Sequence, residues 1–198
     1  ESDASGDGTG YTLTIKKHYA SEAQKLKDKA KDSTKMAKAY KQEKTKRLFV
    51  YSFALMDFKT RMYIAFGTSF KSERDAYNKA MQMAKEMDIK LRSVRLDRYY
   101  SCQQYARELE KTFPDITLYL IPKKNATVKG PWNWKRTLDK FAHQVMAYLK
   151  EYFQRNQSES GFSEDKRRFD WKIMQRKPKT INTAQNLTTI WHNLFWLG

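Results

Sequence analysis

Two apolar runs flank a short polar segment in the sequence Leu48-Phe-Val-Tyr-Ser-Phe-Ala-Leu-Met-Asp-Phe-Lys-Thr-Arg-Met-Tyr-Ile-Ala-Phe-Gly67. The separating residues, Asp57-Phe-Lys-Thr-Arg61, are typical of a turn, so the stretch predicts a β-hairpin. Because the apolar residues are nearly continuous on both sides of the turn, we expect the two strands to be buried on at least part of both faces.

The segments on either side of this hairpin complete an alternating order. Tyr11, Leu13 and Ile15 alternate with polar residues and predict a strand within 1–19, after glycines at 6, 8 and 10. Downstream, the apolar spacing predicts a helix at 72–88, a strand at 91–96, a helix at 99–112, a strand at 116–121, and helices at roughly 137–155 and 180–196. The resulting order, β-β-β-α-β-α-β-α, indicates an α/β fold with a mixed sheet and helices on both faces.

The last two predicted helices each carry an apolar stripe that we expect to face the core. The first stripe includes Val145, Met146 and Phe153. The second consists of Ile181, Leu187, Ile190, Leu194 and Phe195.

Composition points to a folded protein that binds a polyanion. The 198 residues predict a single domain, and Lys plus Arg number 39 against 22 for Asp plus Glu, a net charge of +17. This charge favours nucleic acid as the partner over an acidic membrane surface. No run of 18 apolar residues exists and Cys102 is the only cysteine, so we expect no membrane span, no internal disulfide and a cytoplasmic location.

Residues 20–47 form a lysine-rich segment with little apolar content, which we interpret as a basic insertion. Phosphate contact and simple solvation both explain such a segment, and the two interpretations are compatible.

Four chemically distinct residues lie at helical spacing near the C-terminal part of the long predicted helix. On a wheel at about 100° per residue, Tyr152, Arg155, Glu159 and Lys166 fall within roughly a 60° arc. A phenol, a carboxylate and two cations on one face suit a metal ion beside a phosphodiester, although a solvated helix face in a basic chain explains them too. Gly161 within this window predicts a break in the helix before Lys166.

Two further carboxylates could complete such a site. Asp7 lies in the glycine-rich start, and Asp97 follows the strand at 91–96, where ligand sites of α/β sheets form. Together with Glu159, they are the minimum needed to hold two Mg²⁺ or Mn²⁺ ions that activate an attacking hydroxyl. Asp3 and Asp57 are alternatives to Asp7, and Asp57-Phe-Lys-Thr also suits an ordinary hairpin turn.

These segments resemble the insertion-sequence transposases that have an RNase H-like catalytic domain and a Tyr-Arg-Glu-Lys signature. Tyr152-x2-Arg155-x3-Glu159-x6-Lys166 has the signature spacing, while Asp7-Gly-Thr-Gly-Tyr11 and Val94-Arg-Leu-Asp97-Arg98 resemble the two catalytic Asp segments. The resemblance covers nearly the whole chain and implies a DDE transposase that cleaves transposon ends and joins them to target DNA. A non-catalytic basic DNA-binding remnant and a general RNase H-type nuclease are the alternative functions.

The resemblance also implies a role for each matched residue. Asp7, Asp97 and Glu159 would be the catalytic metal ligands. The residues expected to contact DNA are Tyr152, Arg155, Lys166 and Arg98. The expected partner is double-stranded DNA, bound by a dimer. Because related proteins have a DNA-binding region before the first Asp, we expect residues 1–198 to be a catalytic fragment that lacks this region.

Overall fold

The computed structural model describes residues 1–13, 24, 49–175 and 177–198. Five strands form one mixed sheet: β1 (Ser2–Thr12), β2 (Phe49–Asp57), β3 (Tyr63–Ser69), β4 (Leu91–Leu96) and β5 (Thr117–Tyr119). The helices are α3 (Glu73–Glu86), α4 (Gln103–Thr112), α5 (Trp132–His143), α6 (Val145–Phe153), α7 (Asn156–Phe169) and α8 (Pro178–Leu197), with a short 3-10 helix at Arg98–Tyr100. The predicted basic insertion at 20–47 lies outside the described residues except for Gln24.

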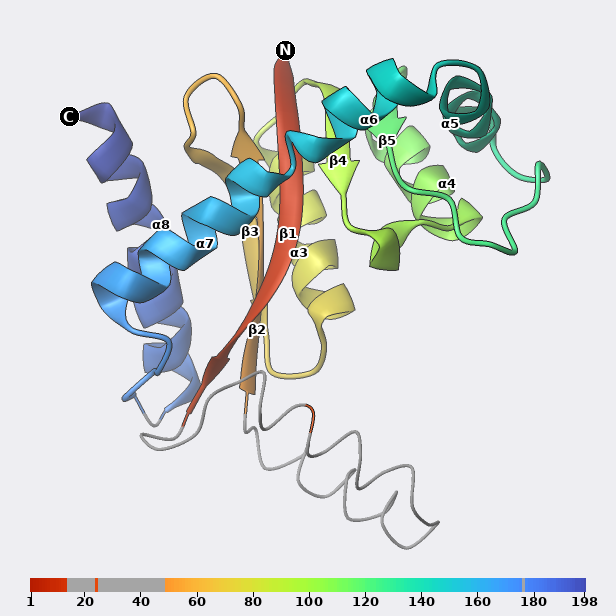
Figure 1. Cartoon of the computed structure of the whole chain (residues 1–198). Helices are drawn as coiled ribbons and strands as arrows, with labels where there is room; N and C mark the ends of the chain where they lie inside the picture. The colour runs from red at the N-terminus through yellow and green to blue at the C-terminus, as the bar shows by residue number, and fades with distance from the viewer. Residues whose placement is uncertain (14–23, 25–48, 176) are drawn as a thin grey trace, which may run out of the picture.

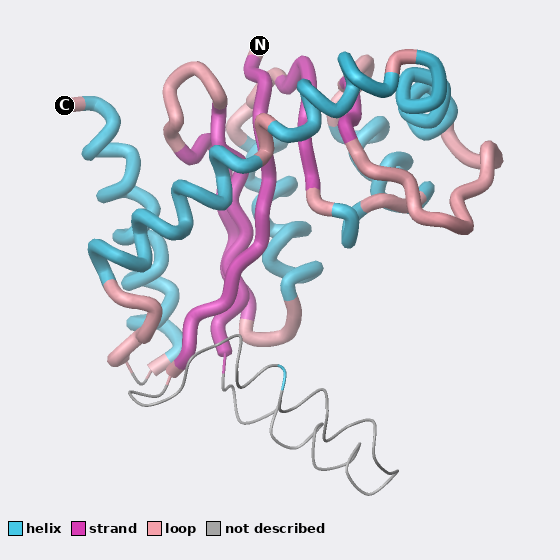
Figure 2. Tube along the Cα trace, viewed as in Figure 1, coloured by secondary structure: helices cyan, strands magenta, loops and turns pink. Residues whose placement is uncertain are grey.

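The strands lie in the order β3-β2-β1-β4-β5, with β1 at the centre (Figure 1). β1 pairs antiparallel with β2 and parallel with β4, and β4 pairs parallel with β5. The sheet is therefore antiparallel on one side of β1 and parallel on the other. Figure 2 shows the strands with helices around them. The alternating order predicted from the sequence is confirmed, as is the mixed sheet.

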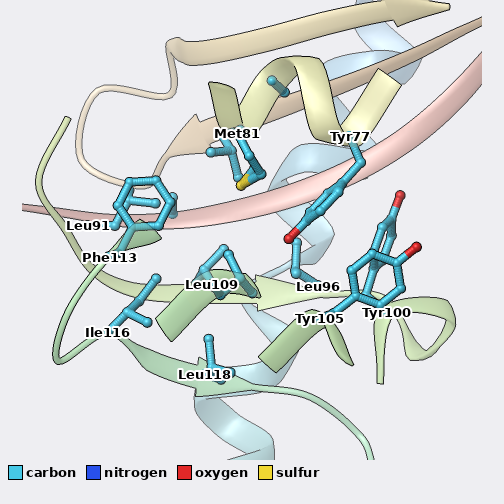
Figure 3. Close-up of a cluster of buried hydrophobic side chains, with 14 of the residues drawn as sticks. Tyr77, Met81, Leu91, Leu96, Tyr100, Tyr105, Leu109, Phe113, Ile116 and Leu118 are labelled. Carbon is cyan, nitrogen blue, oxygen red and sulfur yellow. The ribbon is translucent and has the colours of Figure 1, made fainter. Parts of the chain in front are cut away.

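Helices cover both faces of the sheet because neighbouring residues of a strand point to opposite sides. Phe53 and Leu55 belong to the larger core. Figure 3 shows other members of this core, including Tyr77 of α3 and Leu109 of α4. Ala54 and Met56, on the other face of β2, pack instead with Phe162 of α7. β4 ends at Leu96, which pairs with Gly6, so the carboxyl end of β4 lies beside the middle of the central strand β1.

Several element boundaries follow directly from local chemistry. The hydroxyl of Ser72 accepts a hydrogen bond from the backbone N–H of Asp75 and caps α3, as its position before an acidic first turn predicts. β4 occupies the predicted residues 91–96, and α4, within the predicted helix at 99–112, buries Tyr105 and Leu109.

The structure corrects the prediction for the first strand. We expected the alternating residues Tyr11, Leu13 and Ile15 to form it, after the glycines. β1 instead begins at Ser2, runs through all three glycines and ends at Thr12. The side-chain pattern was misleading because small residues are needed here: a Cβ on Gly6 would lie 2.6 Å from side-chain atoms of Leu96 and Phe53.

The predicted helix at 137–155 is two helices. α5 ends at His143 and α6 begins at Val145, with Gln144 non-helical at φ −132° and ψ 43°. Val145, Met146 and Phe153 are exposed, so this part of the expected apolar stripe is wrong. α6 buries Tyr148 and Tyr152 in their place.

The apolar stripe predicted for the last helix is also wrong. Ile181 is buried, but the other four residues of the stripe are about half exposed. The residues that α8 buries beside Ile181 are polar: Gln185, Thr189 and His192. Hydrogen bonds from buried polar residues therefore help to hold α8 against the sheet.

None of the helices in the described part of the chain is both long and apolar enough to cross a membrane.

Candidate active site

Asp7 and Asp97 lie side by side because of the register between two parallel strands. Gly6 of β1 pairs with Leu96 of β4, so the next residues of both strands are the two aspartates. Asp97 is the first residue after β4 and caps the 3-10 helix by accepting a hydrogen bond from the N–H of Tyr99 at 3.4 Å. The two carboxylates thus come from the central strand and from the carboxyl end of its parallel neighbour, where α/β sheets bind ligands.

Arg155 connects Asp97 to the third carboxylate. Its Nη2 lies 2.5 Å from Oε1 of Glu159 and 3.6 Å from Oδ1 of Asp97. Arg155 is the residue at the junction of α6 and α7, and Glu159 is one turn further along α7. The guanidinium therefore holds two of the three predicted ligands near one point.

The environment of Asp7 disfavours its charged form. Burial raises the pKa of this carboxyl to about 7, a hydrogen bond from the Gly8 backbone acts against the rise, and the Glu159 carboxylate adds to it. Since the interaction with Glu159 contributes to this shift, the two carboxylates lie within electrostatic reach of each other. A carboxylate that is costly to ionise alone would gain from a neighbouring divalent cation.

Lys166 approaches the same strand from α7. Its Nζ donates to the hydroxyl of Thr9 at 2.5 Å and lies 5.2 Å from the centre of the Tyr11 ring. Burial lowers the pKa of Lys166, and the Asp7 carboxylate acts in the opposite direction. Lys166 is thus a half-buried cation on α7. It contacts Thr9, which lies two residues after Asp7 on β1.

Tyr152 is buried at the end of α6, and its ring centre lies 5.7 Å from the guanidinium carbon of Arg155. The four signature residues therefore converge on one region, although the helix that carries them is not continuous. The break lies at Gln154 and Arg155, where α6 ends and α7 begins, and not at Gly161 as predicted. α7 runs unbroken through Gly161 to Phe169.

Arg98 is exposed and adjacent to Asp97, in the 3-10 helix. This position leaves its guanidinium available to a ligand that reaches the edge of the sheet near Asp97.

The two alternatives to Asp7 lie elsewhere. Asp57 pairs with Ala4, near the opposite end of β1, and its carboxylate accepts hydrogen bonds from the N–H and hydroxyl of Thr60 in the hairpin turn. Asp3 accepts hydrogen bonds from Arg92 and Ser93 at the start of β4. The geometry thus places Asp7, rather than Asp3 or Asp57, beside Asp97.

A metal ion could use this donor set only if Arg155 moved. Among the described residues, no group of three or more His, Cys, Asp or Glu side chains already has a metal-binding arrangement. The three carboxylates nevertheless supply the oxygen ligands that Mg²⁺ prefers, and the guanidinium occupies the position of a cation between two of them. In the described part of the chain, the buried Nη1 of Arg155 has no hydrogen-bond partner, so its present position leaves it incompletely satisfied.

Glu73 is a fourth carboxylate near the site. From the sequence alone, it is only an acidic residue in the first turn of a helix. Its Oε1 accepts a hydrogen bond from the Tyr100 hydroxyl at 2.7 Å, and its charge contributes to the raised pKa of Asp7. It reaches β1 because Gly8 has no side chain: a Cβ there would lie 2.4 Å from the Glu73 carboxyl carbon. The glycine at position 8 was the available signal, since glycine in a strand often marks such a close approach.

This contact gives the first prediction. Replacing Gly8 by Ala is expected to push the Glu73 carboxylate away from β1 and to lower the free energy of unfolding by about 1 kcal/mol, as overpacking does. In a Glu73→Ala background the same substitution should cost nothing, because the obstructing carboxylate is gone. Urea unfolding of the four proteins measures the coupling; equal costs in both backgrounds would contradict the contact.

Comparison with known proteins gives one relevant match. The chain is 41% identical over 193 residues to a protein of Archaeoglobus fulgidus described as "Probable transposase for insertion sequence element ISA1214". The alignment covers 98% of this chain and 53% of the relative, so the chain spans about half the length of the curated relative it matches. No family model and no solved structure matches the chain. The chain is therefore similar, over nearly its whole length, to part of an insertion-sequence transposase.

Proposed function

We propose that this chain is the catalytic part of a DDE transposase, in which Asp7, Asp97 and Glu159 bind two Mg²⁺ or Mn²⁺ ions. The observation that carries the proposal is the convergence of these carboxylates, with Arg155, where the carboxyl end of β4 lies beside the middle of β1. The likeness to the probable transposase of Archaeoglobus fulgidus supports the same proposal.

The architecture supports an RNase H-like domain. The element order is the β-β-β-α-β-α-β-α order that the resemblance implies, with the first Asp on the central strand and the Glu on a late helix.

The proposed chemistry is phosphodiester cleavage at transposon ends, followed by strand transfer into target DNA. Divalent ions at the three carboxylates would supply an activated hydroxyl and charge stabilisation at the leaving oxygen. The chain's own residues would hold the DNA: Arg155 and Arg98 flank Asp97, while Tyr152 and Lys166 border the same region. A net charge of +17 favours binding to the DNA backbone.

The test of this proposal is a calorimetric titration of the protein with Mn²⁺ or Mg²⁺. Saturable binding is expected, and Glu159→Gln is expected to weaken it by about tenfold because one ligand charge is lost. Glu86→Gln is the matched control, because it makes the same change of charge at an exposed carboxylate at the end of α3. Equal binding by all three proteins, or no saturable binding by any, would contradict the metal site.

Two other functions make different predictions. A non-catalytic DNA-binding remnant would bind DNA without saturable metal binding. A general RNase H-type nuclease would bind metal but would cleave duplexes irrespective of the transposon-end sequence. Dimer formation on DNA and a separate DNA-binding region belong to the proposed transposase as a whole and rest on the same resemblance. The proposed cytoplasmic location rests on the single cysteine, Cys102.

A further inference from the structure

Three side chains that the proposed chemistry does not use form a buried polar network beneath α7. Asp165 of α7 and His192 of α8 are 1% and 0% exposed, and Tyr63 of β3 is also buried. The Tyr63 hydroxyl donates to Oδ2 of Asp165 at 2.8 Å, and Nδ1 of His192 lies 2.8 Å from Oδ1. On the other side of the imidazole, Nε2 lies 3.0 Å from the carbonyl oxygen of Arg61.

This geometry requires the Asp165–His192 pair to hold a proton. The carbonyl of Arg61 can only accept, so Nε2 must carry a hydrogen. Two lone pairs would then face each other between Nδ1 and Oδ1 unless a second proton lies there, on one atom or the other. Burial and the Asp165 carboxylate raise the pKa of Tyr63, so its hydroxyl stays protonated and donates.

The network attaches α8, which apolar packing holds only weakly, to α7 and β3. α8 buries polar residues against the sheet, while most of its large apolar side chains are exposed. Asn193, beside His192, adds two bonds to the edge strand: its Oδ1 accepts from the Tyr63 N–H at 2.7 Å, and its Nδ2 donates to the Tyr63 carbonyl at 2.8 Å. Unpaired strand groups are thereby satisfied by a helix.

The glycine at position 161 lets α7 lie close to the network without displacing its neighbours. A Cβ there would lie 2.3 Å from Cε of Met56, 3.0 Å from the Tyr63 hydroxyl and 3.4 Å from the His192 ring. Gly161 and Asp165 are one turn apart on α7, so both face the network. Glu159 lies on another face of the same helix, and Lys166 directly follows Asp165.

We infer that Tyr63, Asp165 and His192 are positioning residues that fix the rotation of α7, and with it the placement of Glu159 and Lys166 against β1. A helix that turned by 20° about its axis would displace a carboxylate at the helix surface by roughly 2 Å. Functional sites tolerate displacements of only about 0.5 Å. A buried, hydrogen-bonded anchor on the same rigid helix supplies that restraint. The role in placing Glu159 rests on the proposed function, whereas the anchoring of α7 does not.

The test compares two substitutions at one position. Asp165→Asn can keep every bond with a neutral imidazole, since the amide oxygen accepts from Tyr63 and the amide N–H donates to Nδ1 of His192. Asp165→Ala removes both bonds. Leu109→Ala is the control for a general loss of stability, because Leu109 is buried in α4, in the core on the opposite face of the sheet.

The first readout is amide hydrogen exchange, which needs no activity. Asp165→Ala is expected to accelerate exchange in residues 156–169 and in α8, Asp165→Asn to restore the wild-type pattern, and Leu109→Ala to accelerate exchange around α4. The second readout is the Kd for Mn²⁺, expected to rise about 10- to 100-fold in Asp165→Ala, the range for residues that support ligands, and less than about threefold in Asp165→Asn and Leu109→Ala.

Unchanged exchange in residues 156–169 of Asp165→Ala would overturn the anchoring of α7. Faster exchange with an unchanged Kd would overturn the positioning of Glu159. If the wild-type protein bound no Mn²⁺, the proposed function would fail by itself, and the exchange pattern alone would then support or overturn the anchor.

Discussion

Replacement of Asp97 by Asn is expected to lower the rate of metal-dependent cleavage of a transposon-end duplex by about a thousandfold. Asp97 is the one carboxylate of the three that directly follows a parallel strand, and it lies in register with Asp7. Asn keeps the shape and can still cap the 3-10 helix, so the fold should remain intact. The expected loss corresponds to several kcal/mol of transition-state stabilisation, the amount that a metal site supplies.

The measurement is strand cleavage of a labelled duplex that contains the transposon end, with Mg²⁺ and with Mn²⁺. Asp88→Asn is the matched control, because Asp88 is an exposed carboxylate that pairs with Lys90 away from the site. Its left-handed backbone, with φ at 51°, is one that Asn also adopts readily. Similar rates for Asp97→Asn and the wild type would exclude Asp97 from the reaction. Cleavage that ignored the end sequence would favour a general nuclease.

The parts of the fold that the sequence predicted well are those in which local pattern and tertiary packing agree. The strand at 91–96 is confirmed at both ends, and Ser72 caps α3 as expected. The apolar runs around Asp57 form the predicted hairpin, since a strand buried on both faces must be apolar throughout.

The predictions that were wrong share one physical cause: contacts from elsewhere in the chain overrode the local pattern. The glycines of β1 do not favour a strand, but the close approach of Leu96, Phe53 and Glu73 requires them. The apolar spacing of α8 suggested a buried stripe, whereas the helix is held by His192 and Asn193. Neither the hydrogen-bond partners nor the bend at Gln144 can be derived from the spacing of apolar residues.

The sequence suggested candidate residues for the site but not how they are arranged. The helical spacing placed Arg155 and Glu159 one turn apart, and the structure has them in contact. The register that aligns Asp7 with Asp97 depends on pairing between strands about 90 residues apart, which a single sequence does not specify. The carboxylate of Glu73 was missed for the same reason, because its neighbour Gly8 belongs to a distant segment.

Arg155→Gln is expected to change metal binding and DNA cleavage in opposite directions. The guanidinium now pairs with Glu159 and lies near Asp97, so a cation at those carboxylates must first displace it. Removing it should tighten the Kd for Mn²⁺ by roughly three- to tenfold, consistent with the modest energy of ion pairs to half-exposed carboxylates. In the metal-bound protein, the proposed role of Arg155 is to exchange these carboxylates for a DNA phosphate. Losing one such charged donor at a reacting phosphate should slow cleavage by about a hundredfold.

Because Arg155→Gln is expected to tighten metal binding and to slow cleavage, it is more informative than a variant that only loses activity. A purely structural role for Arg155 would weaken metal binding and slow cleavage together, since both depend on the placement of Glu159. A role in DNA binding alone would leave the Kd for Mn²⁺ unchanged. Arg168→Gln is the matched control, because Arg168 pairs with Glu164 one turn away on the same helix and lies over Phe195, away from the three carboxylates. Only tighter metal binding combined with slower cleavage would agree with a guanidinium that holds the ligands together until DNA and metal arrive.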